Sequence, residues 1–387
     1  MRRWLPWLGL FVTAACGGDS APADLLGECA ALVDSCLVEQ NACVVGESGP
    51  ACVVCGPGTY APHDRQGCQP IGGTPLSHEF PDNTTEPGGE LRGLCRSWTL
   101  NNPEPLWINA VELEQDEISH HSNWMFVPDD RFDGPDGIWP CAERNYSQTE
   151  AALAGGVLYA QSTQAVHEVQ KFPDGVVVKL PANARIISDI HTLNTTTQTV
   201  TGNAKLTVYT VPPDQVDLVL TPFHVDYHGL NIPPQSDARF TGVCNLEDRY
   251  KALGAPRFEL QVYYMLPHTH ALGTRMFVEA YGGAHDGTTI IDVVGFNGEA
   301  RGRSYFPPLD VSGAEGLRFG CEFHNPTSET VVWGFDDQEM CEALGFAATP
   351  FVFESRIDEA VAEEPEGELL KFTGDCNSLV LPWEGKD

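Results

Sequence analysis

Short apolar runs, many of them rich in β-branched or aromatic residues, recur along the chain from about residue 75, and turn residues separate them. Runs of this length and composition predict β-strands. Helical periodicity is weak apart from two short stretches, 247–254 and 337–346. The pattern favours an all-β fold built from sandwiches. The expected strands are 106–113, 175–180, 184–193, 204–211, 216–223, 257–266, 274–281, 289–296, 330–335 and 351–355.

The 387 residues are enough for two or three domains. A proline-bounded joint, "TVPPDQ" at 210–215, divides the strand-rich part of the chain. We therefore expect one sandwich over 73–213 and a second over 214–387. No internal repeat at a fixed short period is evident, and two sandwiches of similar size would leave only a weak one.

A cysteine-rich segment precedes the sandwiches. Cys52 and Cys55 form a CxxC pair, which could bind zinc or act in redox chemistry, but no second CxxC or histidine pair follows at zinc spacing. We expect a disulfide-stapled module within 17–72, serving as a tether and stalk or spacer where a partner could bind. Its six cysteines are at positions 29, 36, 43, 52, 55 and 68.

The N-terminus has two arginines, a short apolar segment and small residues before Cys16, which is typical of a secretory signal. "TAAC" resembles a bacterial lipobox, with Thr13 in place of the usual aliphatic residue, so we interpret 1–16 as a lipoprotein signal peptide with Cys16 as the lipidated residue. The protein is then expected in the cell envelope, facing the periplasm or at the cell surface, and anchored to the membrane only by its lipid. Removing Cys16 from the 13 cysteines leaves 12, an even number that fits a disulfide framework in an exported chain.

The charge is strongly acidic, with 54 Asp and Glu against 22 Lys and Arg and a net charge of −32. Such a surface repels nucleic acid and anionic headgroups, which argues against a DNA or RNA partner. It can attract cations, although acidity alone more often serves solubility.

Candidate metal ligands occur at four places in the predicted sandwiches. They are His120 and His121, His191, His268 and His270, and Met340, which directly precedes Cys341. Two residues apart on a strand, His268 and His270 would project from one face and converge. Adjacent histidines on a regular strand point to opposite faces, so His120 and His121 can share an ion only where the backbone is bent or bulged. Taken singly, each candidate also has an ordinary structural or surface interpretation.

The order HH, H, HTH and Met-Cys resembles that of the copper type II, ascorbate-dependent monooxygenases, the family of dopamine β-hydroxylase and the peptidylglycine-hydroxylating enzymes. The surrounding sequence is similar too, with "CRSW" before HH, "GLNIPP" and "FTGVC" before HTH, and "GCEFHN" before "EMC". The resemblance spans about residues 75–380 and implies two consecutive jelly-roll-like antiparallel sandwiches. It also implies that the six remaining cysteines pair as Cys95–Cys141, Cys244–Cys376 and Cys321–Cys341.

The resemblance implies two copper ions per chain. His120, His121 and His191 resemble the ligands of an electron-transfer copper, and His268, His270 and Met340 resemble those of the catalytic, oxygen-binding copper. A thioether favours Cu(I), the state that meets dioxygen, whereas zinc has little use for it. The implied reaction is hydroxylation of a C–H bond in a small organic substrate with O2 and a one-electron donor such as ascorbate.

The sequence departs from the peptide-amidating members where they bind substrate. Leu266 replaces their arginine two residues before HTH, and Glu342 and Leu344 replace their Asn and Tyr after Met-Cys. Peptidylglycine is therefore not the expected substrate. Glu342 is a candidate on the substrate side that could favour a cationic or hydroxylated compound, or else it is an exposed acid on a short helix. Asp189 replaces a glutamine two residues before the third histidine.

Two other interpretations remain open. One is a non-catalytic copper protein that stores or senses copper at the surface on the same scaffold, because fold does not fix function. The other is an adhesion or structural lipoprotein with no stoichiometric copper. The histidines not expected to be ligands are His224, His228 and His324, and those expected to be solvated are His63, His78, His167 and His285.

Overall fold

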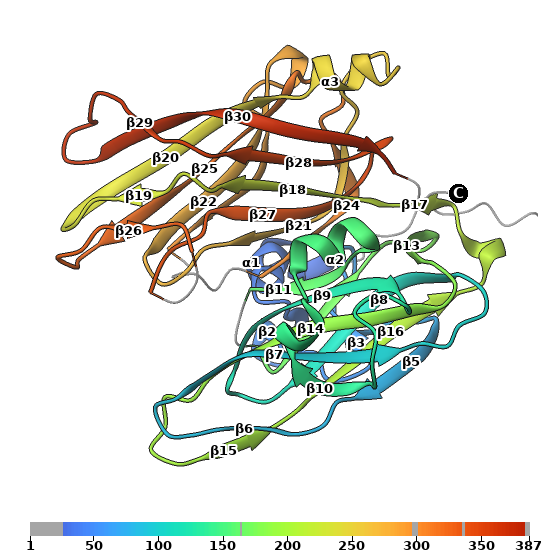
Figure 1. Cartoon of the computed structure of the whole chain (residues 1–387). Helices are drawn as coiled ribbons and strands as arrows, with labels where there is room; N and C mark the ends of the chain where they lie inside the picture. The colour runs from blue at the N-terminus through green and yellow to red at the C-terminus, as the bar shows by residue number, and fades with distance from the viewer. Residues whose placement is uncertain (1–25, 163–164, 296–300, 335–336, 384–387) are drawn as a thin grey trace, which may run out of the picture.

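The computed structural model describes residues 26–162, 165–295, 301–334 and 337–383, with only the backbone of His120, His121 and Thr149. Mostly antiparallel β-strands form two sandwich lobes, and a small disulfide-rich module lies at the N-terminal end (Figure 1). This confirms the predicted fold class, two jelly-roll-like sandwiches preceded by a disulfide-rich module. In these described ranges no helix is long and apolar enough to cross a membrane.

The first lobe has two main sheets. Their strand orders are β10-β7-β14-β9-β11 and β17-β13-β8-β16-β5, with β12 paired to β8, and β6 pairs with β15 separately. Helix α2 packs on β9 and β11. The bounds are β5 Thr74–Glu79, β6 Asn83–Thr85, β7 Glu90–Thr99, β8 Leu106–Gln115, β9 Ser119–Pro128, β10 Gly137–Pro140, α2 Gln148–Ala154, β11 Gly156–Gln161, β12 His167–Lys171, β13 Val176–Leu180, β14 Ala184–Leu193, β15 Val200–Gly202, β16 Ala204–Val211 and β17 Leu218–Val219.

The second lobe is one continuous sheet folded on itself, in the order β23-β22-β25-β20-β30-β28-β18-β27-β21-β24, with β29 on β30. The long strand β30 pairs with β20 at one end and β28 at the other, so it joins the two layers. The bounds are β18 Thr221–Tyr227, β19 Asn231–Ile232, β20 Ser236–Asn245, α3 Glu247–Ala252, β21 Gln261–His268, β22 Gly273–Tyr281, β23 Thr289–Val294, β24 Arg303–Asp310, β25 Gly316–Asn325, β26 Val331–Val332, β27 Glu342–Ala348, β28 Phe351–Ile357, β29 Val361–Ala362 and β30 Leu370–Pro382.

The apolar core of the first lobe continues into the second. Tyr263, Tyr264 and Phe346 of the second lobe belong to the same buried cluster as the first lobe's core residues. Phe172 of the first lobe meets Phe346 edge to face, with ring centroids 5.6 Å apart. The lobes are therefore joined by close apolar packing.

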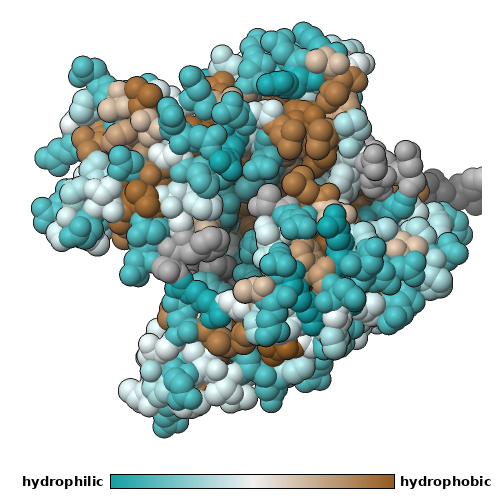
Figure 2. Space-filling model, viewed as in Figure 1, coloured by the Kyte–Doolittle hydropathy of each residue, from teal (hydrophilic) through white to brown (hydrophobic). Residues whose placement is uncertain are grey.

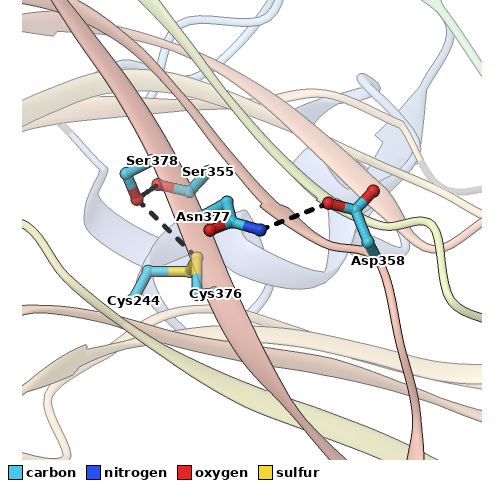
Figure 3. The surroundings of a disulfide bond; sticks show 6 residues. All are labelled: Cys244, Ser355, Asp358, Cys376, Asn377 and Ser378. Carbon is cyan, nitrogen blue, oxygen red and sulfur yellow. Dashed lines mark hydrogen bonds between the residues drawn. A yellow bond between two sulfur atoms is a disulfide. The ribbon is translucent and has the colours of Figure 1, made fainter.

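All the disulfides expected in the two lobes are present. Figure 3 shows the one that ties β20 to β30, where Ser378 Oγ lies 3.7 Å from Cys376 Sγ and 2.9 Å from Ser355 Oγ. The cysteines of the CxxC pair bond to other partners, which confirms stapling. The bonds are Cys29–Cys43, Cys36–Cys52, Cys55–Cys68, Cys95–Cys141, Cys244–Cys376 and Cys321–Cys341.

The cysteine-rich module packs on the first lobe instead of standing apart as a spacer. Glu112 on β8 accepts hydrogen bonds from the backbone N–H of Gly58 at 2.6 Å and from Tyr209 Oη at 2.6 Å, and its Oε1 lies 2.8 Å from His167 Nε2. The prediction that His167 is solvated is therefore wrong. The module's elements are a 3₁₀ turn Gly27–Ala31, α1 Val33–Val38, β1 Ala42–Gly46, β2 Gly49–Val53, β3 Thr59–Tyr60 and β4 Gln69–Pro70.

Of the two stretches with helical periodicity, only one is a helix. Helix α3, Glu247–Ala252, lies within the expected 247–254. In 337–346 the chain instead enters strand β27 at Glu342, because this segment pairs with both β18 and β21. Tertiary pairing outweighs the local pattern there.

The two lobes repeat one local motif. Asn194, after β14, donates from Nδ2 to three backbone carbonyls and accepts at Oδ1 from Thr196. Asn325, at the end of β25, makes the same set of bonds, with Thr327 as its donor. Strand β14 lies between β7 and β9, as β25 lies between β20 and β22. These correspondences are the weak repeat expected of two similar sandwiches.

Candidate metal centre

A cavity of about 1520 Å³ lies between the lobes. Candidate ligands from both lobes line it: His191 from the first, and His268, His270 and Met340 from the second. On the face in Figure 2 most of the surface is hydrophilic, in keeping with the net charge of −32, and apolar patches interrupt it on both lobes. Candidate ligands that are far apart in the sequence therefore line one cavity.

Strand β14 supplies the first lobe's part of the site. As the central strand between β7 and β9, it is buried on both faces over 184–188. From Asp189 onward burial alternates, so Asp189, His191 and Leu193 are half-buried and line the cavity. Burial raises the pKa of Asp189.

The backbone is irregular where the two adjacent histidines lie. His121 on β9 pairs with His191 on β14, and the next pair is Ser119 with Thr192. Between these two pairs β14 advances by one residue and β9 by two, so His120 is the extra residue of a β-bulge. This is the kind of bulge that two adjacent histidines need to share an ion. The side chains of His120 and His121 lie outside the described part of the structure.

Glu90 on β7 is an anionic neighbour of His191. A carboxylate oxygen of Glu90 contacts His191 Nε2, and Glu90 also pairs with Arg92. Burial alone would raise the pKa of Glu90, but the hydrogen bonds from Arg92 and His191 lower it. Nothing near Glu90 in the sequence signals this contact, because its partner is far along the chain.

Strand β21 ends at His268, and Thr269 and His270 lie in the turn that follows. The prediction that both histidines lie on one strand is therefore wrong. The N–H groups of His270 and Leu272 bond to Glu339, at 2.8 and 2.7 Å, instead of joining a strand ladder. The two imidazole rings still meet, with centroids 5.2 Å apart and planes at 79°.

His270 is held in one orientation by its own lobe. Its Nδ1 lies 2.7 Å from the backbone oxygen of Gln338. Because a carbonyl can only accept, Nδ1 carries the proton and the lone pair of the neutral ring is at Nε2. Burial lowers the pKa of His270, which favours the neutral ring that a metal requires.

Glu339 fixes the residues before Met340 to the same turn. Its side chain is 1% exposed, and both carboxylate oxygens accept backbone N–H groups there. Burial raises the pKa of Glu339 to about 7, against the lowering effect of these N–H groups. Met340 follows at once and is buried, and Cys341 ties the segment to β25.

His268 is held from the other lobe. Ser162, which directly follows β11 in the first lobe, places its Oγ 2.6 Å from His268 Nδ1. Like Glu339, it is a contact that the sequence did not point to. Glu339 at least precedes Met-Cys within "EMC", whereas Ser162 is far from HTH and carries no local signal.

Glu342 lies on β27, opposite His268 in the strand register, and its side chain is 23% exposed. The interpretation as an exposed acid on a short helix is wrong. Burial alone would raise the pKa of Glu342, but His224, 3.2 Å away, together with the two HTH histidines, lowers it to about 2. Burial and the nearby Glu342 raise the pKa of Asp226 to about 7. An ionised carboxylate therefore lies beside the candidate ligands.

The donor set of the second lobe, two imidazoles and a thioether, fits copper in its Cu(I) state. Among the described side chains, no three from His, Cys, Asp or Glu form a group that could hold a metal ion. The set in question has only two such residues and Met340. Cys16 lies outside the described residues.

No family model matches the chain, and no curated protein matches it. Among solved structures, the major capsid protein P2 of bacteriophage PM2 is 9% identical, covering 71% of this chain and 98% of that chain, with a TM-score of 0.29. The cowpea mosaic virus top component is 10% identical, with 70% and 89% covered and a TM-score of 0.30. VP54 of PBCV-1, fitted into a reconstruction of the virophage Sputnik, is 7% identical, with 71% and 93% covered and a TM-score of 0.26. Similarity at this level carries no argument about function.

Proposed function

We propose that this chain is a copper-dependent monooxygenase that hydroxylates a C–H bond of a small organic substrate with O2 and a one-electron reductant such as ascorbate. The observation that carries the proposal is the single cavity that His191 lines from one lobe and His268, His270 and Met340 line from the other. The sequence order of these residues does not require them to share a space, so their convergence is separate support for the proposal.

Copper would be held at two places in this proposal. His268, His270 and Met340 would hold one ion, and His191 with His120 and His121 would hold the other. Bound copper supplies electron transfer and oxygen activation. The reaction balances with two electrons from the reductant and two protons: one oxygen atom enters the C–H bond as a hydroxyl, and the other leaves as water.

The chain's own residues would hold the site and select the substrate. The Gln338 carbonyl keeps the His270 lone pair at Nε2, and Glu339 holds the turn around it. Glu342 is an anion on the strand next to that of His268, directly opposite it in the register, and this favours a cationic or hydroxylated substrate. Leu266 and Leu344 line the cavity beside Glu342 and offer an apolar wall in place of a carboxylate clamp.

The same proposal places the protein in the cell envelope, anchored by a lipid at Cys16. The six disulfides fit an oxidising compartment outside the cytoplasm. The acidic surface argues against a nucleic-acid partner.

Copper content and oxygen uptake of the soluble form lacking residues 1–16 test the proposal. The variant Met340→Leu keeps the side-chain volume and removes the sulfur, and Met276→Leu, in the buried core of the same lobe, is the matched control. We expect two copper ions per chain, and a loss of Cu(I) affinity and of ascorbate-dependent oxygen uptake in Met340→Leu alone.

Trace copper that is indifferent to Met340 would contradict the proposal. Two copper ions without substrate-dependent oxygen uptake would favour the non-catalytic copper protein.

A further inference from the structure

We propose that Ser162 of the first lobe is a positioning residue for the metal site of the second lobe, fixing the His268 ring so that copper binding there depends on the docking of the two lobes. The inference rests on the proposed function, because it concerns the copper site formed by His268, His270 and Met340. It assigns a part of that site to the other lobe.

The contact is short, partly buried and well supported. Ser162 is 4% exposed, and its Oγ lies 2.6 Å from His268 Nδ1. The residue before it, Gln161, is anchored by Gln115, whose Nε2 donates to Gln161 Oε1 at 2.7 Å, and both amides donate to the backbone oxygen of Ala165. The end of β11 is thus held in place by a buried amide pair, so Ser162 is a rigid support.

The hydrogen bond bears on which nitrogen of His268 can bind a metal. A serine hydroxyl can donate or accept. A metal at Nε2 requires the proton on Nδ1, and Ser162 Oγ then accepts it. This is the tautomer that His270 has through the Gln338 carbonyl. Both candidate ligand histidines of the second lobe therefore have an oxygen partner at Nδ1 that can set the tautomer and the ring rotation.

The two partners come from different lobes. His270 is held by Gln338 and Glu339 of its own lobe, whereas His268 is held by Ser162 across the interface. Any separation of the lobes would remove the Ser162 contact of His268 and leave the Gln338 and Glu339 contacts of His270 in place. A metal-binding histidine that loses the partner of its other ring nitrogen binds copper less tightly, so docking of the first lobe favours copper loading of the second.

The test isolates the second site in a His191→Ala background, which removes a ligand of the first site. Ser162→Ala deletes the hydroxyl, and Ser162→Thr retains it. Ser97→Ala is the control, since Ser97 is also buried in the first lobe and its Oγ accepts from Trp139 Nε1 at 3.0 Å, away from the candidate ligands. Cu(I) affinity is measured by competition with a chromophoric chelator, and unfolding by urea. Nitrogen NMR of the imidazoles in the metal-free chain reports the His268 tautomer.

We expect Ser162→Ala to weaken Cu(I) binding by about 10–100-fold, the usual effect of losing the partner of a metal-binding histidine. It should also alter the His268 tautomer signal, and Ser162→Thr should recover most of the affinity. Ser97→Ala should lower stability and leave the affinity unchanged.

Equal affinity in Ser162→Ala and its parent would overturn the positioning role while leaving the copper site intact. An equal loss in Ser97→Ala would also overturn it, because the effect would then be one of general stability. A parent that binds no copper would overturn the proposed function and this inference together.

Discussion

Replacing Glu112 by alanine removes a buried carboxylate on which three groups converge. Glu112 is 2% exposed, and it contacts the Gly58 N–H, Tyr209 Oη and His167 Nε2 at 2.6, 2.6 and 2.8 Å. Gly58 belongs to the cysteine-rich module, whereas the other two groups belong to the first lobe. The substitution is therefore expected to weaken the packing of the module on the first lobe and to leave the candidate metal site unchanged.

The expected loss of stability follows from the hydrogen-bond donors that no longer have the Glu112 carboxylate as their acceptor. A buried donor without an acceptor costs about 1–3 kcal/mol, and removing one member of a buried charged cluster costs about 3–5 kcal/mol. Two effects reduce the cost: His167 keeps some contact with water, and the variant no longer has a carboxylate to desolvate. The lower end of the range for a buried charged cluster therefore applies. We expect a loss of about 3 kcal/mol in the free energy of unfolding at neutral pH.

The loss should also depend on pH. Burial alone would raise the pKa of Glu112, but the hydrogen bonds from His167, Tyr209 and Gly58 lower it. A carboxyl group with a lowered pKa contributes stability that is present above its ordinary pKa and is lost as the pH falls through the folded value. The difference between wild type and Glu112→Ala should therefore shrink in acid.

Urea unfolding and limited proteolysis of the module measure the effect. The control is Glu114→Ala, two residues along the same strand, because Glu114 pairs at 2.7 Å with Lys205 while the two side chains are 28% and 41% exposed. An exposed pair of this kind is worth less than about 1 kcal/mol. If Glu112→Ala lost no more stability than Glu114→Ala, and its module resisted protease equally well, the account of module docking would be refuted.

Further outcomes are expected from the site and the interface. Glu339→Gln should weaken Cu(I) binding about 10-fold in chelator competition, because its amide N–H₂ would face a backbone N–H of the HTH turn. Burial lowers the pKa of His224, but the hydrogen bond and charge of Glu342 outweigh it and raise the pKa to about 9. The pair therefore stabilises the fold fully below pH 6.5, and this contribution is lost as the pH rises through 9. Unfolding of His224→Gln should differ from wild type by roughly 1–2 kcal/mol at pH 6, reduced by partial exposure, and converge above pH 10. Phe346→Ala should cost about 3–5 kcal/mol by calorimetry, because it opens the packing between the lobes, whereas the exposed Leu381→Ala should stay within about 0.5 kcal/mol.

Those parts of the fold that depend on local pattern could be predicted from the sequence. The apolar runs 184–193 and 204–211 are strands with those bounds, because central strands are buried on both faces and leave a continuous signal. The disulfide pairs of the lobes also agreed with the resemblance. Candidate ligands could be named because histidine and methionine are chemically distinctive, and their common cavity could not be derived from spacing.

Features that depend on distant polar contacts could not be predicted. His270 leaves the expected strand because Glu339, far along the chain, takes the N–H groups of its turn. Ser162 reaches His268 from another lobe, and the contacts that hold the module on the first lobe include the Gly58 N–H that Glu112 accepts and the Val169 N–H that Gln40 accepts. A single hydrogen-bond partner leaves no periodicity in a sequence, so only the folded arrangement reveals it.

The two lobes carry different side chains at equivalent positions of their repeated motif. On the central strands, the position three residues before the shared asparagine is His191 in the first lobe and Glu322 in the second. His121 is the register partner of His191 on the neighbouring strand, and Arg275 is the register partner of Glu322. Glu322 accepts hydrogen bonds from Arg239 and Arg275 at 2.9 and 3.0 Å. One sheet position therefore holds a candidate metal ligand in one lobe and an ion-pair cluster in the other. Because the same backbone supports both, the jelly-roll arrangement does not determine the reaction, and the proposal of copper chemistry rests on the side chains that line the cavity.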